Sequence, residues 1–239
     1  SDPSSLDLAS RVCPFADAPN ETEIAAARFP LAPNQHAALG RYEAIYAGFS
    51  EEYRNAAGSG GITRWLLSTL LDSGEIDFVL TVDRKLAGET GDLFHVAFHE
   101  TSGDYLAHTS TSAYFPITFD QALRNLKDRE GRFAVTALPC FSRALRSYAM
   151  IDSAFEERLA FISGTICGAL KSRRYAQYLA WQMGVPKDAL SRINFRGKTL
   201  SRTANEKCVE VWSKGNTTEI PDSVKRVQDL KGTDYGSGY

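Results

Sequence analysis

The pattern of apolar and polar positions predicts helices and strands that alternate along the middle of the chain. Apolar residues at helical spacing predict helices over residues 20–29, 63–71, 118–131 and 172–185. Apolar and β-branched runs bounded by turn residues predict strands over residues 40–49, 78–82, 93–100, 132–140 and at the end of 155–168. The stretch 104–110 is predicted as a further strand, paired with 93–100 across the turn "TSGD". From residue 191 onward the chain is more polar and strand-like.

Alternating helices and strands indicate an α/β fold. Several of the predicted strands are apolar throughout, which is typical of a sheet covered by helices on both faces. We therefore predict a mixed, largely parallel sheet flanked by helices, with a partial C-terminal strand-rich region. The predicted domains are an N-terminal extension over residues 1–40, an α/β domain over 41–190 and the start of a C-terminal domain over 191–239.

Composition excludes several classes of protein. With 43% hydrophobic and 23% charged residues, the 239-residue chain has the composition of an ordinary globular protein. Its net charge of -2 comes from 27 basic and 29 acidic residues. A protein that binds nucleic acid or anionic lipid would be expected to have a clustered basic excess, which this sequence lacks. No apolar run approaches the ~18 residues that a membrane-spanning helix needs. No secretion signal is visible and the four cysteines are too few for a disulfide framework, so we expect a cytoplasmic protein.

A glycine-rich turn, Gly58-Ser59-Gly60-Gly61, opens the helix predicted to begin at Thr63. The first amides of a helix lack intrahelical partners, and the helix dipole places about half a positive charge there. Glycines let the backbone approach a phosphate closely, and the hydroxyls of Ser59 and Thr63 can add donors. The turn is neither a Walker loop, since no Lys follows it, nor the full dinucleotide fingerprint with its three spaced glycines. The alternative interpretation is a tight turn that only precedes a packed helix.

Two cysteines follow apolar strands, Cys140 in "LPC" and Cys167 in "TICG". In a parallel sheet both would emerge at the carboxyl edge, where ligands of open α/β sheets bind. The simpler interpretation is that they only pack, as free cysteines usually do, and two cysteines alone cannot hold zinc or an iron–sulfur cluster. A hydrolase or transferase with Cys140 as its nucleophile would need a nearby histidine, and no histidine is convincingly placed. His95 and His99 would lie about 13 Å apart on a strand, too far to share a metal.

Two basic stretches are candidates for contact with an anion. Arg196 and Lys198 stand at alternate positions of a predicted strand and therefore on one face. A solvated sheet edge is the alternative interpretation of this pair. The segment "KSRRY", residues 171–175, opens a predicted helix, where basic side chains oppose the helix dipole. A bound anion would relieve that conflict.

Five segments, taken in order, resemble the beta-subunit family of coenzyme F420 (deazaflavin) hydrogenases and dehydrogenases. They are "YRNAAGSGGITRWLLSTLLDSGEIDFVLTV", "STSAYFP", "FAVTALPCFSRALR", "ISGTICGALKSRRYAQYLAWQMGV" and "INFRGK". The resemblance implies a flavoprotein that binds FAD and carries one or more four-iron (4Fe-4S) iron–sulfur clusters. It also implies electron transfer between iron–sulfur centres and an organic acceptor.

The resemblance assigns roles to individual residues. It implies that FAD is held by Ser59, Gly60, Gly61, Ile62 and Thr63, that Ser110, Ser112 and Tyr114 line the same pocket, that Lys198 lies near the flavin or substrate, and that Cys140 and Cys167 are cluster ligands. Because the flavin carries the chemistry, no side chain is expected to act as a catalytic acid or base.

The sequence departs from the family pattern in three places. A ferredoxin-like cysteine run usually precedes the position of Cys13, and a Cys-x-x-Cys pair follows that of Tyr239, but this sequence has neither. The segment "CGALKS" also replaces the usual histidine after Cys-Gly. We therefore expect a fragment in which residues 1–40 are the remnant of a ferredoxin-like segment and the cluster is incompletely ligated.

The expected function is that of an FAD-dependent oxidoreductase domain. Its acceptor would be the deazaflavin coenzyme or a polysaccharide-related substrate, and its partner a redox protein or ferredoxin, within an oligomer or alone. The alternative is a non-catalytic nucleotide-binding or scaffold module of the same fold, which the missing cysteine motifs favour.

Overall fold

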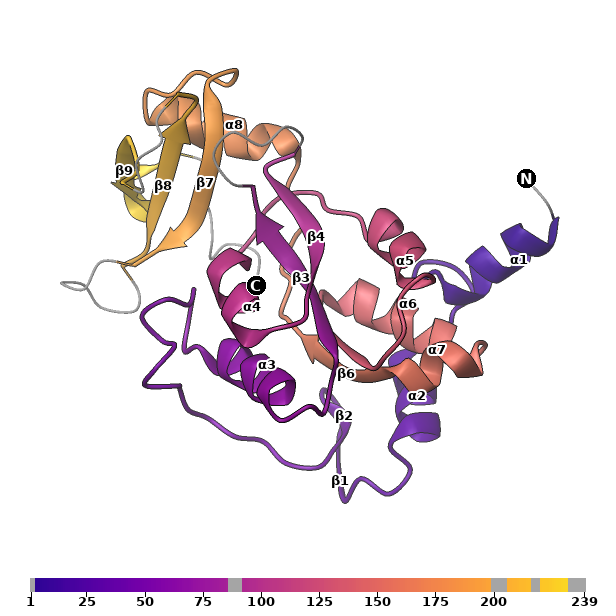
Figure 1. Cartoon of the computed structure of the whole chain (residues 1–239). Helices are drawn as coiled ribbons and strands as arrows, with labels where there is room; N and C mark the ends of the chain where they lie inside the picture. The colour runs from indigo at the N-terminus through magenta and orange to yellow at the C-terminus, as the bar shows by residue number, and fades with distance from the viewer. Residues whose placement is uncertain (1–2, 86–91, 199–205, 216–219, 232–239) are drawn as a thin grey trace. The chain divides into compact units, whose positions relative to one another are not determined.

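The computed structural model describes residues 3–85, 92–198, 206–215 and 220–231 (Figure 1). The chain divides into two compact units, each built from two separate stretches of sequence. The first unit comprises Ser1–Gly48 and Gly131–Ile166, and the second comprises Phe49–Glu130 and Cys167–Tyr239. The chain thus passes through the two units alternately.

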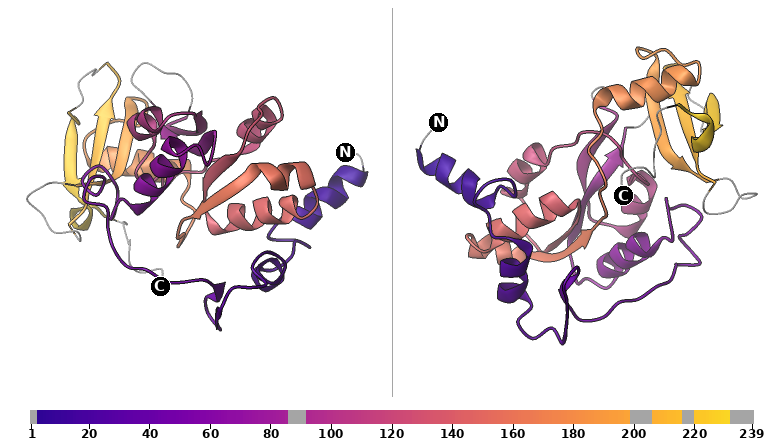
Figure 2. Two further views of the ribbon diagram at one scale, coloured as in Figure 1. Left: turned by 60° about the horizontal axis from the view of Figure 1, so that its bottom comes forward. Right: turned by 180° about the vertical axis from the view of Figure 1, so that it is seen from behind.

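The first unit is built from helices and a parallel strand pair. Its described elements are α1 (Pro3–Val12), α2 (Glu21–Arg28), β1 (Asn34–His36), β2 (Gly40–Tyr42), β5 (Phe133–Ala137), α6 (Pro139–Ala149), α7 (Ser153–Arg158) and β6 (Leu159–Gly164). Strands β5 and β6 pair in parallel, and α6 and α7 form the crossover that a parallel connection requires. Figure 2 shows α6 beside β6, and α1 and α2 also pack against α6.

Local sequence signals explain where these helices begin. Asn20 and Glu23 form a reciprocal capping box at the start of α2. Pro139 occupies the first turn of α6, where its missing N–H removes no helical hydrogen bond. Asp152 caps α7 by accepting a hydrogen bond of 2.9 Å from the Phe155 amide.

The second unit contains an antiparallel strand pair and a separate antiparallel sheet. Its described elements are α3 (Ile62–Asp72), β3 (Phe78–Arg84), β4 (Phe94–His99), α4 (Ser102–His108), α5 (Asp120–Leu126), α8 (Arg173–Gln182), β7 (Leu190–Gly197), β8 (Cys208–Ser213), β9 (Ser223–Arg226) and the 3₁₀ turn η1 (Val227–Asp229). Strands β3 and β4 pair with Leu80 opposite Phe98, and α3 and α4 pack on this pair. Strands β7, β8 and β9 form the second sheet, with α8 beside it (Figure 1).

A buried apolar cluster joins α8 to the sheet of β7 and β8. Its fully enclosed members include Ala176, Leu179, Phe195, Val209 and Val211. Each buried side chain of this size contributes on the order of 1.5–3 kcal/mol relative to an exposed one, apart from the smaller alanine. This cluster therefore holds the C-terminal part of the second unit together.

One predicted strand is wrong, and another is confirmed only in part. Residues 104–110 belong largely to helix α4, because Thr101 caps a helix here by accepting a hydrogen bond from the Asp104 amide. The predicted strand over residues 40–49 is confirmed only for Gly40–Tyr42, since its partner β1 is just three residues long. Sequence reasoning also missed helices α1, α6 and α7.

The predicted fold class is confirmed: this is an α/β protein with a mixed sheet flanked by helices and a strand-rich C-terminal region. The predicted domain boundaries after residues 40 and 190 stay a prediction, and part of the last predicted domain lies outside the described residues. Among the helices that the structure describes, none is long and apolar enough to cross a membrane.

Candidate functional site

The glycine-rich turn before α3 is a tightly packed helix entrance. Gly61 is the N-cap of α3 and adopts a left-handed conformation with φ 82°, and no side chain caps the first helical amides. A Cβ atom on Gly61 would lie 2.8 Å from the backbone N of Arg54 and the backbone C of Tyr53. A glycine is therefore required here on two grounds, the backbone conformation and the contact with residues 53–54. The turn leaves positively polarised amides at the start of an eleven-residue helix.

Lys198 lies at the same turn, and its predicted place near the flavin or substrate stays a prediction. Its Nζ donates to the backbone carbonyls of Ser59 and Arg54. Burial lowers the pKa of Lys198, and the neighbouring positive charges of Arg54 and Arg196 lower it further. The Lys198 ammonium thus stabilises the turn through these two hydrogen bonds and places a positive charge beside it.

Ser112 also reaches this entrance. A Cβ atom on Gly58 would lie 3.2 Å from Ser112 Oγ and 3.3 Å from the Thr111 carbonyl. Ser110 lies two residues before Ser112, and its amide donates a hydrogen bond to the carbonyl of Val82 in β3. The backbone glycines of the turn therefore permit a close approach of the segment that carries both serines.

The space beside these serines is small. Ser110, Thr111 and Ser112 line a hollow together with Arg84, Phe94, Arg192, Ile193 and Asn194, and it has room for about 10 Å³, enough for about one water molecule. The Tyr114 ring packs edge-on against Phe195, with ring centroids 5.4 Å apart. The hollow is too small for a flavin ring, and Tyr114 lies against the core cluster.

A larger hollow lies at the start of α8. It measures about 510 Å³, is open to solvent, and is lined by Pro116, Leu170, Lys171, Ser172, Arg173 and Arg174. The guanidinium of Arg173 forms a bidentate ion pair with the carboxylate of Asp92 at this hollow. Lys171 lies over the Tyr175 ring, 5.7 Å from its centroid. The basic segment 171–175 therefore borders a concave surface, in line with the anion-binding alternative.

The predicted cluster cysteines lie in different units. Cys140 is the second residue of α6 in the first unit and is half-buried, whereas Cys167 is exposed in the second unit. Cys208 is buried on β8. In the part of the chain that the structure describes, no cysteine belongs to a group of three or more metal-ligand side chains. The roles of Cys140 and Cys167 as cluster ligands stay a prediction.

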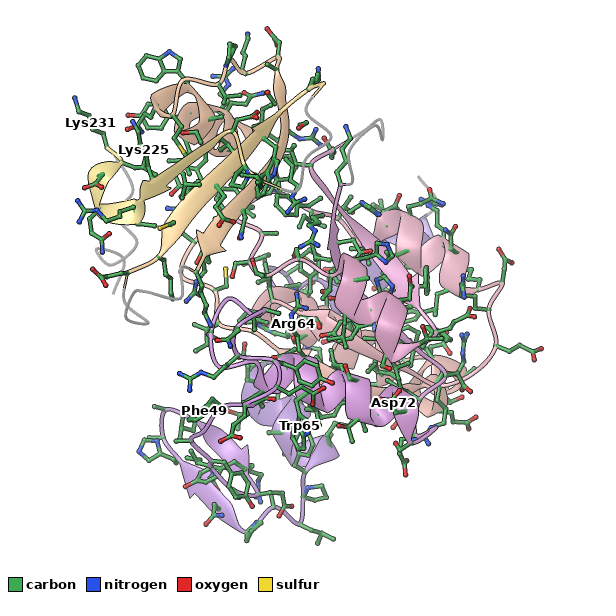
Figure 3. The ribbon with its side chains drawn as sticks, turned by 60° about the vertical axis from the view of Figure 1, so that its left-hand side comes forward. Phe49, Arg64, Trp65, Asp72, Lys225 and Lys231 are labelled. Atoms are coloured by element: carbon green, nitrogen blue, oxygen red, sulfur yellow. The ribbon has the colours of Figure 1, made fainter. Side chains whose placement is uncertain are left out.

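Arg64 is a structural residue that sequence reasoning missed. It is 8% exposed, and its guanidinium donates to the carbonyls of Leu106 and Thr109 at 3.2 Å each. Burial lowers the pKa of Arg64. Figure 3 shows Arg64 and its neighbour Trp65 leaving α3 on opposite sides, and Trp65 is exposed. Arg64 thus binds the last turn of α4 to the first turn of α3.

A histidine–aspartate cluster was also missed. His99 is buried, and its two ring nitrogens contact Asp83 and Asp104, while His108 contacts the other side of Asp104. Burial is the largest single influence on His99 and lowers its pKa, but the hydrogen bonds with the two aspartates raise the pKa overall. The hydrogen bond with His99 lowers the pKa of Asp104. The sequence signal was the spacing of Asp104 and His108, because residues four apart are neighbours on a helix but lie about 13 Å apart on a strand.

Comparison with known proteins places the chain in a family. The model "Coenzyme F420 hydrogenase/dehydrogenase, beta subunit N-term" matches residues 45–124, and the corresponding C-terminus model matches residues 130–231. The first match contains the α3 entrance and Ser110–Tyr114, and the second contains Cys140, Cys167 and Lys198. No curated protein matches the sequence.

One solved structure with a similar fold is a chain of the F420-reducing NiFe hydrogenase complex from Methanosarcina barkeri. The identity is 17% and the TM-score 0.49, with 76% of this chain and 59% of that chain covered. This chain thus spans less than two thirds of the length of that hydrogenase chain. The two family models both describe the beta subunit of redox enzymes. On these matches, the chain belongs to the coenzyme F420 hydrogenase/dehydrogenase beta-subunit family.

Proposed function

We propose that this chain is an FAD-dependent oxidoreductase domain in which the turn from Gly58 to Gly61 receives the diphosphate of the flavin nucleotide. The domain exchanges electrons between iron–sulfur centres and an organic acceptor, either the deazaflavin coenzyme or a polysaccharide-related substrate. The observation that carries the proposal is the uncapped entrance of α3, opened by a left-handed glycine and flanked by the Lys198 ammonium.

The entrance has the physical properties that a diphosphate requires. Helix-start amides without a capping side chain present donors, and the helix dipole favours negative charge at the same place. The turn is exposed at Ser59, whereas Gly58 and Gly61 are buried against their neighbours. The Ser59 position is therefore accessible to a ligand.

This placement separates the role of the cofactor from the roles of the residues around it. When bound, FAD supplies hydride or single-electron chemistry that the side chains lack. The chain's own residues bind the diphosphate at the turn, orient it through Ser59 and Thr63, and hold the turn in shape through Lys198. Ser112 lies against Gly58 and is proposed to line the same site.

The proposed iron–sulfur chemistry requires more ligands than the two predicted cysteines. A four-iron cluster takes about four thiolates, and Cys140 and Cys167 supply only two of them. We therefore assign no electron-transfer step to a cluster within the described residues. The second candidate function is a non-catalytic module that binds the nucleotide without turning over.

Flavin binding is tested by comparing FAD with riboflavin, which lacks the diphosphate. The variant Ser59→Asp adds a negative charge at an exposed position near the start of a helix, where an acidic residue favours folding. Against a diphosphate, one such charge costs about 1 to 4 kcal/mol, depending on the effective dielectric constant. We expect FAD affinity to fall by about tenfold or more, with riboflavin binding unchanged.

The matched control is Ser153→Asp, which adds the same charge in the first turn of α7, in the other unit. This control should bind FAD as the parent does. Equal FAD affinity in Ser59→Asp and the parent would contradict the proposed diphosphate site. If FAD binds at the turn but is not reoxidised by any acceptor after chemical reduction, the non-catalytic alternative is correct.

A further inference from the structure

A buried imidazole lies between two carboxylates in the second unit. His99 is 3% exposed, and its Nε2 is 2.9 Å from Asp83 Oδ1. Its Nδ1 is 2.5 Å from Asp104 Oδ2. Asp83 comes from β3, His99 ends β4, and Asp104 belongs to α4, so three elements meet at this ring. Figure 1 shows α4 beside these two strands.

A second imidazole completes the group. His108 Nδ1 is 2.9 Å from Asp104 Oδ1, and the rings of His99 and His108 are parallel within 4° with centroids 6.1 Å apart. One potential ligand atom each from His99, Asp104 and His108 lies within 4.8 Å of the other two. The group therefore offers two imidazole nitrogens and one carboxylate oxygen around one point.

The arrangement calls for a cation between His99 and Asp104. If His99 Nε2 donates its hydrogen to Asp83, then Nδ1 presents a lone pair to a carboxylate, which also only accepts. A proton can fill that position, and so can a metal ion. A carboxylate behind the distal ring nitrogen is the arrangement that orients histidines which ligate metals.

We infer that His99, Asp104 and His108 form a binding site for one divalent transition-metal ion, Zn²⁺ being the best match, with Asp83 orienting His99. Imidazole ligands favour Zn²⁺ and its neighbours in the first transition row, whereas Ca²⁺ and Mg²⁺ prefer oxygen ligands alone. Two imidazoles and one carboxylate are a known donor set for zinc sites that keep an open position. Asp104 and His108 are partly exposed, so solvent can supply the remaining ligand.

The scaffold around the group is already fixed. Thr101 caps α4 through the Asp104 amide, and Arg64 holds the other end of α4 through two carbonyls. An isolated bridge pairs Asp83 with Thr109 just beyond His108. Because both ends of the short helix are anchored, metal binding needs only small adjustments of the Asp104 and His108 side chains. This inference is independent of the flavin.

The test is a calorimetric titration of the purified, chelator-treated full chain with Zn²⁺, and with Co²⁺ as a spectroscopic probe. We expect one tight site in the parent, and a loss of affinity of at least about tenfold to a hundredfold in His108→Gln and Asp104→Ala. His95→Gln is the matched control, because His95 is an exposed histidine on the same strand as His99. It should bind zinc as the parent does.

Thiolates are the competing zinc ligands, and the Co²⁺ spectrum separates the two cases. Nitrogen and oxygen ligation without a cobalt–sulfur charge-transfer band supports the site. Paramagnetic Co²⁺ should also broaden the imidazole resonances of His99 and His108 while those of His36 and His95 stay sharp, a readout that needs no variant. A cobalt–sulfur band for the tight site, undiminished binding in His108→Gln, or no tight binding at all would overturn the inference.

Discussion

The substitution Gly61→Ala tests how the α3 entrance is built. A left-handed conformation costs a non-glycine residue about 1–2 kcal/mol, and Gly61 has φ 82°. The new methyl group would also lie 2.8 Å from two backbone atoms, Arg54 N and Tyr53 C, which cannot move aside as a flexible side chain would. Overpacking of this kind typically costs about 1–3 kcal/mol. The total loss should be about 2–5 kcal/mol in the free energy of unfolding.

The matched control is Gly184→Ala. Gly184 has φ 85°, nearly the same as Gly61, but a Cβ atom there meets nothing within 4 Å. Its loss should therefore be only the conformational part, about 1–2 kcal/mol. Urea-induced unfolding of the parent and both variants, followed by circular dichroism, measures the difference. Equal losses in the two variants would show that the turn does not pack against residues 53–54, and the account of the entrance would be refuted.

Three further predictions concern single side chains. Arg64→Met should cost about 3 kcal/mol or more in the free energy of unfolding, because the buried carbonyl of Thr109 and the part-buried carbonyl of Leu106 lose a charged donor. The exposed control Arg124→Met should cost under about 0.5 kcal/mol. Lys198→Met should lower the free energy of unfolding by about 1–2 kcal/mol and weaken FAD binding, because the carbonyls of Arg54 and Ser59 lose their shared donor. Unchanged stability and FAD affinity would contradict this role of Lys198. Asp152→Ala should cost about 1 kcal/mol at pH 7. The backbone hydrogen bond from the Phe155 amide lowers the folded-state pKa of Asp152, so this stability is present above the unfolded pKa of about 3.9 and is lost as pH falls through the folded pKa. Denaturation at pH 7 and at pH 2 should show that the stability difference between the parent and Asp152→Ala shrinks at the lower pH. A constant difference would refute the linkage.

The elements with strong local signals could be predicted from the sequence. The helix predicted over residues 20–29 contains α2, and the glycine-rich turn marked the start of α3. Strands β3, β4, β5 and β6 were found because each lies in a run of apolar and β-branched residues bounded by turn residues. In these places local propensity and tertiary packing agree.

The errors have a common physical cause. The segment 104–110 has the aromatic and apolar residues of a strand, but the Thr101 cap and the buried Tyr105 favour a helix that packs on β3 and β4. That one error concealed the cluster of His99, Asp104 and His108, because Asp104 and His108 are neighbours when four residues make about one helical turn but lie about 13 Å apart on a strand. The burial of Arg64 depends on carbonyls more than forty residues away, which no local pattern reveals.

The candidate flavin site was predictable in part. The α3 entrance was recognised from its glycines, and the structure brings Lys198 and Ser112 to it from segments far along the chain. The expectation that these residues share one site came from the family resemblance. Periodicity alone predicts which face of an element a residue occupies, but not which distant turn it lies beside.

The entrance of α3 is proposed to bind the diphosphate of FAD. The most direct measurement is a titration of the isotope-labelled full chain with FAD and with riboflavin, following the backbone amide resonances of residues 58–64 and 171–175. The account predicts that FAD shifts the amides of Gly60, Gly61 and Ile62 most strongly and that riboflavin leaves them in place. Shifts confined to residues 171–175, or equal shifts with the two ligands, would contradict it.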